Sequence, residues 1–192
     1  IKNALSSDEA EKTLGLLWDY LEGLGTGIDR NNTSTWGDDR WPTCAHGGIM
    51  PSYGIGHSEA QWFLRGVPNV KKAFAKIWDT DELLTSFDGV SLWRPWNINP
   101  EWKTESGQSW FHIDQHPISK PGKQCIQGLV NLLPTSREIG GNVIIPGSHK
   151  FFENLPNEYE ERLSRLPLDI DHFRFPNDDP KLSSSKAVMC HM

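Results

Sequence analysis

The sequence contains little cysteine, and the cysteines form no recognisable pattern. Three occur in 192 residues, at Cys44, Cys125 and Cys190. Their number is odd, their spacings are wide, and no Cys-x-x-Cys pair is present, which argues against a disulfide framework and a structural zinc site. The pattern favours three reduced thiols, so we expect an intracellular, cytoplasmic protein.

Long apolar runs and basic runs are missing as well. No stretch approaches the roughly 18 apolar residues that a membrane-spanning helix needs, which predicts no membrane span. Lysine and arginine are scattered and the formal net charge is −6 at pH 7, which argues against nucleic acid as a partner. Gly-x-Ser-x-Gly, His-Glu-x-x-His and phosphate-binding glycine motifs are also absent, so nucleophilic hydrolase and nucleotide-binding functions lack support.

The first 85 residues carry helical patterns. Ser6 with Glu9 three residues later is typical of a capping box, and leucines follow at helical spacing up to Gly25. A long ordered loop is expected over residues 26–56. A second helix is predicted from Ser58 to residue 66, and a third from Pro68 to about residue 78, because proline is favoured in the first turn of a helix. Residues 81–84 are predicted to form a short helical turn.

The later part of the chain changes to β-type patterns. Short runs at residues 87–93, 109–114, 124–133 and 142–145 are interrupted by Pro, Gly or Asn. A surface helix is predicted over residues 158–166, a polar loop over 175–185, and the start of another strand over 186–190. Helices first and strands later predict an α+β fold that is mainly β, with an antiparallel sheet or jelly roll. We expect a single domain over residues 1–192, helical in 1–85 and β-rich in 86–192.

The sequence Trp110-Phe-His-Ile-Asp114 contains a candidate pair of metal ligands. On a strand, residues i and i+2 point to the same face, so His112 and Asp114 would present an imidazole and a carboxylate side by side. This is two thirds of the ligand set of a 2-His-1-carboxylate iron site, which leaves coordination positions open. The second histidine is not evident from the pattern.

Other histidines are weaker candidates. His116 would be collinear with His112 and Asp114 along one strand, and three collinear side chains cannot surround one face of an ion, so we interpret it as a strand-end residue. His57 with Glu59 lies at a predicted helix start, where i and i+2 do not share a face, and helix capping is the favoured interpretation. His46, beside two glycines, is interpreted as a loop residue.

Three segments in order, WFHIDQHP, CIQGLVNLLP and GGNVIIPGSHK, resemble the phytanoyl-CoA dioxygenase family. The resemblance is specific over residues 110–149 and weaker back to about residue 50. It implies a cupin-like double-stranded β-helix that binds Fe(II) and uses 2-oxoglutarate as cosubstrate with O2. His112 and Asp114 match the family's iron ligands, and His149 matches a histidine that is not a ligand. Gln127 and Arg94 are weak candidates for cosubstrate binding.

The sequence departs from the family towards its end. The family's distal histidine and its 2-oxoglutarate-anchoring arginine follow a turn that is not recognisable here, and residues 186–192 resemble the strand before that turn. We therefore expect a chain truncated at its C-terminus, with the last strands missing, inactive and poorly stable by itself. His191 is a disfavoured substitute for the distal histidine, because it precedes the expected turn and lies at a chain end that would fray.

The resulting hypothesis is a non-haem Fe(II)- and 2-oxoglutarate-dependent dioxygenase that hydroxylates an unknown small organic substrate. One alternative is a non-catalytic jelly-roll module that binds a small molecule on the same scaffold, since one fold hosts many functions. A cupin-like metal enzyme with other chemistry is a further alternative. The presence of a second histidine ligand and dependence on the cosubstrate distinguish these hypotheses.

Overall fold

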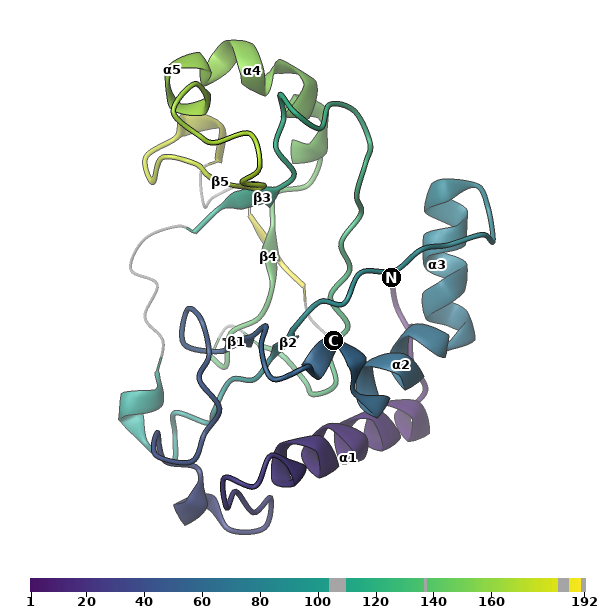
Figure 1. The fold of residues 1–192 in the computed structure, drawn as a ribbon, viewed down its shortest axis with the longest axis vertical. Helices are drawn as coiled ribbons and strands as arrows, with labels where there is room; N and C mark the ends of the chain where they lie inside the picture. Colours follow the sequence, from purple (N-terminus) through teal and green to yellow (C-terminus); the bar gives the residue numbers. More distant parts are fainter. Residues whose placement is uncertain (104–109, 137, 183–186, 191–192) are drawn as a thin grey trace. The chain divides into compact units, whose positions relative to one another are not determined.

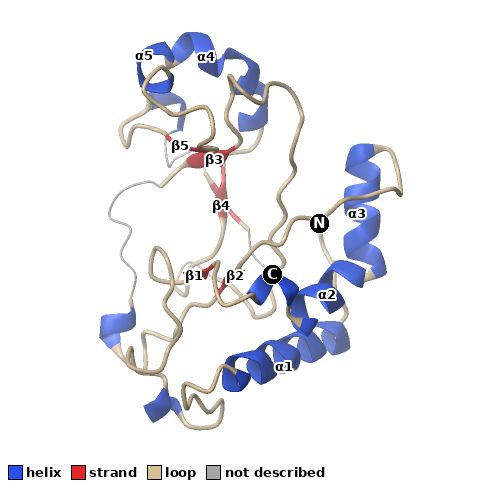
Figure 2. Ribbon diagram, viewed as in Figure 1, coloured by secondary structure: helices blue, strands red, loops and turns tan. Residues whose placement is uncertain are grey.

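The structure is a computed structural model that describes residues 1–103, 110–136, 138–182 and 187–190. The chain forms two compact units, Ile1–Glu105 and Ser106–Met192 (Figure 1). Among the described residues, the first unit contains three α-helices and a small ribbon of two strands, and the second contains two such ribbons and two short α-helices; both units also contain 3-10 helices (Figure 2). The prediction of a single domain stays a prediction.

Helix α1 (Ser7–Gly23) begins as its sequence predicts. The Ser6 hydroxyl accepts a hydrogen bond from the Glu9 amide at 3.2 Å, and the Glu9 carboxylate accepts one from the Ser6 amide at 2.8 Å. This reciprocal capping box satisfies two amide groups that the first helical turn leaves without partners. Leu17 and Leu21 are buried on the inner face, and α1 packs against α2.

Helices α2 (Glu59–Gly66) and α3 (Pro68–Trp78) follow the predicted ranges closely. Ser58 caps α2, because its hydroxyl accepts a hydrogen bond from the Gln61 amide. Pro68 stands in the first turn of α3. The predicted helical turn at residues 81–84 does not form; these residues are irregular. Within the described residues, no helix has both the length and the apolarity needed to cross a bilayer.

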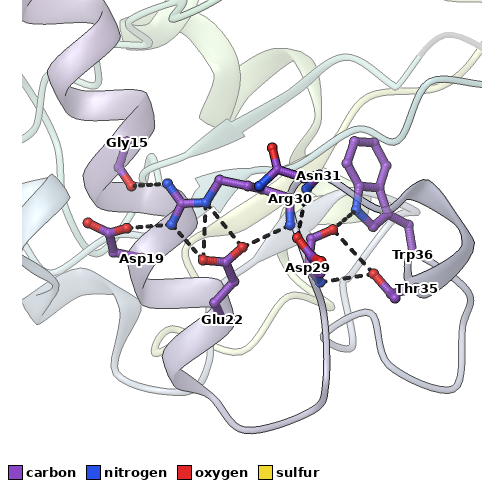
Figure 3. A network of polar contacts seen from close by, with 8 residues as sticks. All are labelled: Gly15, Asp19, Glu22, Asp29, Arg30, Asn31, Thr35 and Trp36. Atoms are coloured by element: carbon purple, nitrogen blue, oxygen red, sulfur yellow. Dashed lines mark hydrogen bonds and ion pairs between the residues drawn. The ribbon is translucent and has the colours of Figure 1, made fainter.

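Arg30 organises the long loop that follows α1 (Figure 3). Its guanidinium forms ion pairs with Asp19 and with Glu22, the second at 2.6 Å, and so ties the loop back to the last turns of the helix. The Asp29 backbone carbonyl then accepts a hydrogen bond from the Trp36 indole at 2.9 Å. The loop is therefore ordered by specific polar contacts, as the sequence predicts.

The loop leads to a short ribbon in the first unit. Strand β1 (Ile49–Met50) pairs antiparallel with β2 (Val90–Ser91). The 3-10 helices of this unit are η1 (Thr33–Thr35), η2 (Ile55–His57) and η3 (Pro100–Trp102). A Cβ atom on Gly89 would stand 2.4 Å from the Met50 carbonyl oxygen, so this approach of the two backbones requires glycine.

The second unit carries two antiparallel ribbons. Strand β3 (His112–Asp114) pairs with β5 (His172–Arg174), and β4 (Val143–Ile144) pairs with β6 (Val188–Met189) (Figure 1). The helices are η4 (Ser148–Asn154), α4 (Leu155–Glu158), α5 (Glu160–Leu163) and η5 (Pro180–Leu182). One helix is predicted over residues 158–166, whereas the structure has two short helices, α4 and α5, on either side of Tyr159.

An apolar core lies beneath the β3–β5 ribbon. Its buried members are Ile145, Leu155, Leu163, Phe173, Phe175 and Leu182. The rings of Phe173 and Phe175 meet edge to face with centroids 5.1 Å apart, and Tyr159 contacts both. Such aromatic pairs add about 0.5–1.5 kcal/mol beyond the burial of their area. The core thus anchors the inner face of the ribbon.

Two expectations about strands are corrected. No strand forms in residues 124–133, although the structure describes them all. The amides of Gln124 and Cys125 donate to the side chain of Gln115 instead of a neighbouring strand. Strand β5 was not predicted. The described sheets have two strands each and none closes into a barrel; the double-stranded β-helix stays a prediction.

Candidate metal centre

The antiparallel pairing of β3 and β5 gathers three possible metal ligands on one face. Asp114 stands directly opposite His172, and His112 lies two residues before Asp114 on the same side of β3. One ligand atom from each residue lies within 4.8 Å of the other two. Two adjacent strands therefore form a triangle of donors, which one strand cannot do.

His172 is the histidine that sequence reasoning did not find. A local pattern was available: residues 172 and 174 are polar, whereas Phe173 and Phe175 are aromatic and buried. This alternation has the period of a half-buried strand. Phe175 extends the pairing, since its amide donates to the Phe111 carbonyl at 3.0 Å. The partner strand of β5 is set by contacts between residues that lie far apart in the sequence.

Hydrogen bonds orient the imidazole of His112. Its Nδ1 lies 3.0 Å from the Trp110 carbonyl oxygen, and its Nε2 lies 3.6 Å from Asp114 Oδ2. A backbone carbonyl only accepts, so Nδ1 donates and Nε2 carries the lone pair in the neutral ring. Metal-binding histidines in proteins are oriented in the same way, by a hydrogen bond at the other ring nitrogen.

Asp114 contacts both histidines and is anionic. Its Oδ1 lies 3.1 Å from His172 Nδ1. Polar contacts with His112, Gln127 and His172 lower the pKa of Asp114 far below its usual range, although partial burial opposes this. The same carboxylate raises the pKa of His112, against the effect of burial. An ionised carboxylate beside two imidazoles is ready to bind a cation.

The three side chains are partly accessible, and an aromatic ring flanks them. The exposed fractions are 27% for His112, 34% for Asp114 and 44% for His172. The Trp110 ring centroid lies 4.5 Å from that of His112 and 6.2 Å from that of His172. The site is open enough for an exogenous ligand to reach it and has one apolar wall.

A polar contact joins the segments that carry two of the ligands. Asp171, immediately before His172, accepts a hydrogen bond from the His116 amide at 3.3 Å and forms an ion pair with Lys120 at 2.6 Å. These contacts lower the pKa of Asp171. They fix the start of β5 to the loop that follows β3, and so hold His172 opposite Asp114.

His116 shapes this loop and is not part of the ligand cluster. Its ring is fully buried, and Nδ1 accepts hydrogen bonds from the amides of Ile118 at 3.1 Å and Ser119 at 3.2 Å. The interpretation as a residue at the strand end is confirmed. Its Nε2 is buried and has no hydrogen-bond partner among the described residues.

The two predicted cosubstrate residues have different surroundings. Gln127 reaches the site, and its Nε2 donates to Asp114 Oδ2 at 3.0 Å. Arg94 belongs to the other unit; its guanidinium pairs with Asp38 at 2.6 Å and donates to the Trp36 carbonyl at 2.9 Å. A cosubstrate role stays a prediction for both residues.

The remaining histidines within the described residues lie outside the cluster. His149 is exposed at the start of η4. His57 lies in η2 and stacks on Phe87 with ring centroids 4.0 Å apart. His46 adopts a positive φ in a loop. His191 lies outside the described residues.

Comparison with known proteins found two relatives of interest. The chain is 34% identical over 188 residues to "Ava biosynthesis cluster protein O" of Aspergillus versicolor, which covers 94% of this chain and 58% of that protein. It is 28% identical over 195 residues to a Dictyostelium discoideum protein named "Putative phytanoyl-CoA dioxygenase", covering 83% of this chain and 53% of that protein. The chain therefore spans about half the length of these relatives. No family model and no solved structure matches it significantly.

These relatives support a phytanoyl-CoA dioxygenase-like family at moderate identity. The cluster of His112, Asp114 and His172 has the donor types and the spacing to hold a metal ion.

Proposed function

We propose that this protein is a non-haem Fe(II)- and 2-oxoglutarate-dependent oxygenase that hydroxylates a small organic substrate. One observation carries the proposal: the ligand atoms of His112, Asp114 and His172 lie within 4.8 Å of one another on one face of the β3–β5 ribbon. The phytanoyl-CoA dioxygenase name of one relative supports the same class of reaction.

The donor set fits Fe(II). Two imidazoles and one carboxylate form the set that non-haem Fe(II) oxygenases use, and this set leaves positions open for other ligands. All three donors come from one side, and each is partly exposed. Bound Fe(II), with 2-oxoglutarate as cosubstrate, would supply the activation of O2 that oxidation of a substrate C–H bond requires.

The chain's own residues prepare the site. Asp114 would supply the negative charge that offsets the charge of the metal, and it is ionised because its contacts with His112, Gln127 and His172 favour the anion. The Trp110 carbonyl keeps His112 in the tautomer whose Nε2 can donate its lone pair. The indole of Trp110 lies beside the imidazole of His112, with ring centroids 4.5 Å apart, and gives the site an apolar neighbour.

Metal binding by the purified protein tests the site directly. We expect one Fe(II) per chain under anaerobic conditions, with Asp114→Ala and His172→Ala each losing most of the affinity. His149→Ala is the matched control, because His149 is exposed and outside the cluster. Wild-type Fe(II) affinity in the His172→Ala variant would refute the proposed site.

Turnover tests the reaction separately. For a protein of the full length of its relatives, we expect succinate from 2-oxoglutarate only when Fe(II) and O2 are both present, with Asp114→Ala abolishing it. A protein that binds Fe(II) and a small molecule but forms no succinate would favour the non-catalytic binding module instead. Because the chain spans about half the length of its relatives, metal binding is the decisive first readout.

A further inference from the structure

The two oxygens of Asp114 have different partners. Oδ1 lies 3.1 Å from His172 Nδ1. Oδ2 lies 3.0 Å from the amide nitrogen of Gln127, which donates a hydrogen bond to it, and 3.6 Å from His112 Nε2. A side-chain amide nitrogen can only donate, so this contact engages Oδ2 but leaves Oδ1 to other partners.

In the metal-free protein His172 Nδ1 donates a hydrogen bond to Asp114 Oδ1, and a bound metal would take the place of that proton. Imidazole nitrogens and carboxylate oxygens bind such ions at about 2.0–2.2 Å, so two adjacent ligands at right angles stand about 3 Å apart. The distance from Oδ1 to His172 Nδ1 is 3.1 Å. Oδ1, which accepts no hydrogen bond from Gln127, is thus the oxygen whose distance from His172 Nδ1 fits two ligands of one metal.

Gln127 reaches Asp114 because Gln115 folds the intervening loop. The Gln115 amide nitrogen donates to the carbonyls of Lys120 at 2.6 Å and Gly122 at 2.7 Å. Its carbonyl oxygen accepts from the amides of residues 124 and 125 at 3.3 and 3.1 Å. Both donor hydrogens and both lone pairs of this side chain are therefore in use. The loop closes on itself and returns the chain to the site.

We propose that Gln127 is a positioning residue that holds Oδ2 of Asp114, so that Asp114 binds the metal through Oδ1 alone. A carboxylate bound through one oxygen occupies one coordination position instead of two, which leaves more positions for exogenous ligands. Gln127 then acts on the metal through Asp114 and not by lining the cosubstrate. This inference rests on the proposed metal site.

The exposure of Gln127 makes the role separable from folding. Gln127 is solvent-exposed and lies in a segment without regular structure. Exposed substitutions of this kind usually change stability by less than about 0.5 kcal/mol. Removing a group that orients a metal ligand typically costs roughly 10- to 100-fold in metal affinity. The two effects therefore differ enough to be measured apart.

The test uses Co(II) as a spectroscopic probe. Visible absorption and calorimetric titration with Co(II) would compare the wild type with Gln127→Met, which keeps the length of the side chain but removes the donor. We expect a changed Co(II) spectrum and affinity reduced at least tenfold, with an unchanged melting temperature. Gln124→Met is the matched control. Gln124 lies on the same loop, but its side-chain amide donates to the Pro121 carbonyl and not to Asp114. It should match the wild type.

Each outcome decides between specific claims. Gln127→Glu has the same size and cannot donate at neutral pH, so it replaces Gln127→Met if that variant fails to fold, and its spectrum should also change. An unchanged spectrum and affinity in a folded Gln127 variant would overturn the positioning role while leaving the metal site intact. Weaker 2-oxoglutarate binding with an unchanged Co(II) spectrum would also overturn it, in favour of cosubstrate lining. A wild type that binds no Co(II) would refute the proposed site itself.

Discussion

Asp114 and His172 face each other across the β3–β5 ribbon, with Asp114 Oδ1 3.1 Å from His172 Nδ1. The two residues are 58 positions apart in the sequence. Their meeting depends on the pairing register, because a slip of one residue would turn every side chain of β5 to the other face. Phe173 opposes such a slip, since it would move from the core into solvent.

Phe173→Ala should therefore weaken the metal centre, because it removes a core side chain that holds the β3–β5 ribbon in register. Phe173 is 4% exposed and packs against Phe175 and Tyr159. We expect about 3–5 kcal/mol less stability towards unfolding in urea, because truncating a buried phenylalanine removes contacts and leaves a cavity. Metal affinity should fall with it. Phe151→Ala is the control, since Phe151 is 40% exposed; equal losses in the two variants would contradict this account.

The pH should act on metal binding through His112. Asp114 raises the pKa of His112 above its usual value near 6.5 in the metal-free protein. The protonated pair stabilises the fold below that usual value, and this contribution is lost as pH rises through the raised pKa. Metal binding has the opposite sign, because the metal needs the neutral ring. We expect Co(II) affinity to fall about tenfold per pH unit below the His112 pKa.

Titration of His112 by NMR checks the cause of that pH dependence. In the metal-free protein the midpoint should lie above 6.5, and Asp114→Asn should move it down because the neutral amide no longer favours the imidazolium. A midpoint at or below the usual value with Asp114 intact would show that the carboxylate does not control the ring.

Lys120→Met should weaken metal binding more than it weakens folding. The ion pair between Lys120 and Asp171 is open to solvent, so its loss should change the stability of the fold little. It also fixes the residue before His172, and loosening that residue should reduce Co(II) affinity roughly tenfold. Lys120→Arg should restore it. Lys181→Met removes a comparable ion pair with Glu158 elsewhere in the unit; the same loss of affinity there would refute a specific effect.

Helices α1, α2 and α3 were predictable because their signals are local. Ser6, Ser58 and Pro68 stand at helix starts, and each acts within one turn of its own position. His112 and Asp114 were predictable for a similar reason, because a strand places i and i+2 on one face whatever its partner. Local rules of this kind need no knowledge of the rest of the chain.

His172 and the loop before Gln127 were beyond such rules. The alternation around Phe173 indicates a strand, but only its long-range pairing shows that His172 meets Asp114. Residues 124–133 have the composition of a strand, yet the side chain of Gln115 takes the amides of residues 124 and 125. Gln115 thus takes the first two backbone donors of the predicted strand, and β propensity is known to depend on context.

Gln115→Ala should therefore release the loop that carries Gln127. Four hydrogen bonds join the Gln115 side chain to the loop backbone. Each contributes about 0.5–1.5 kcal/mol when buried, and because the loop is exposed we expect a total loss of about 1–2 kcal/mol. The amides of residues 124 and 125 should exchange with solvent faster, and the Co(II) spectrum should change as in Gln127→Met. Gln124→Ala removes one side-chain contact from the same loop and should do neither. Unchanged exchange in Gln115→Ala would mean that other contacts hold the loop, and Gln127 would then reach Asp114 without Gln115.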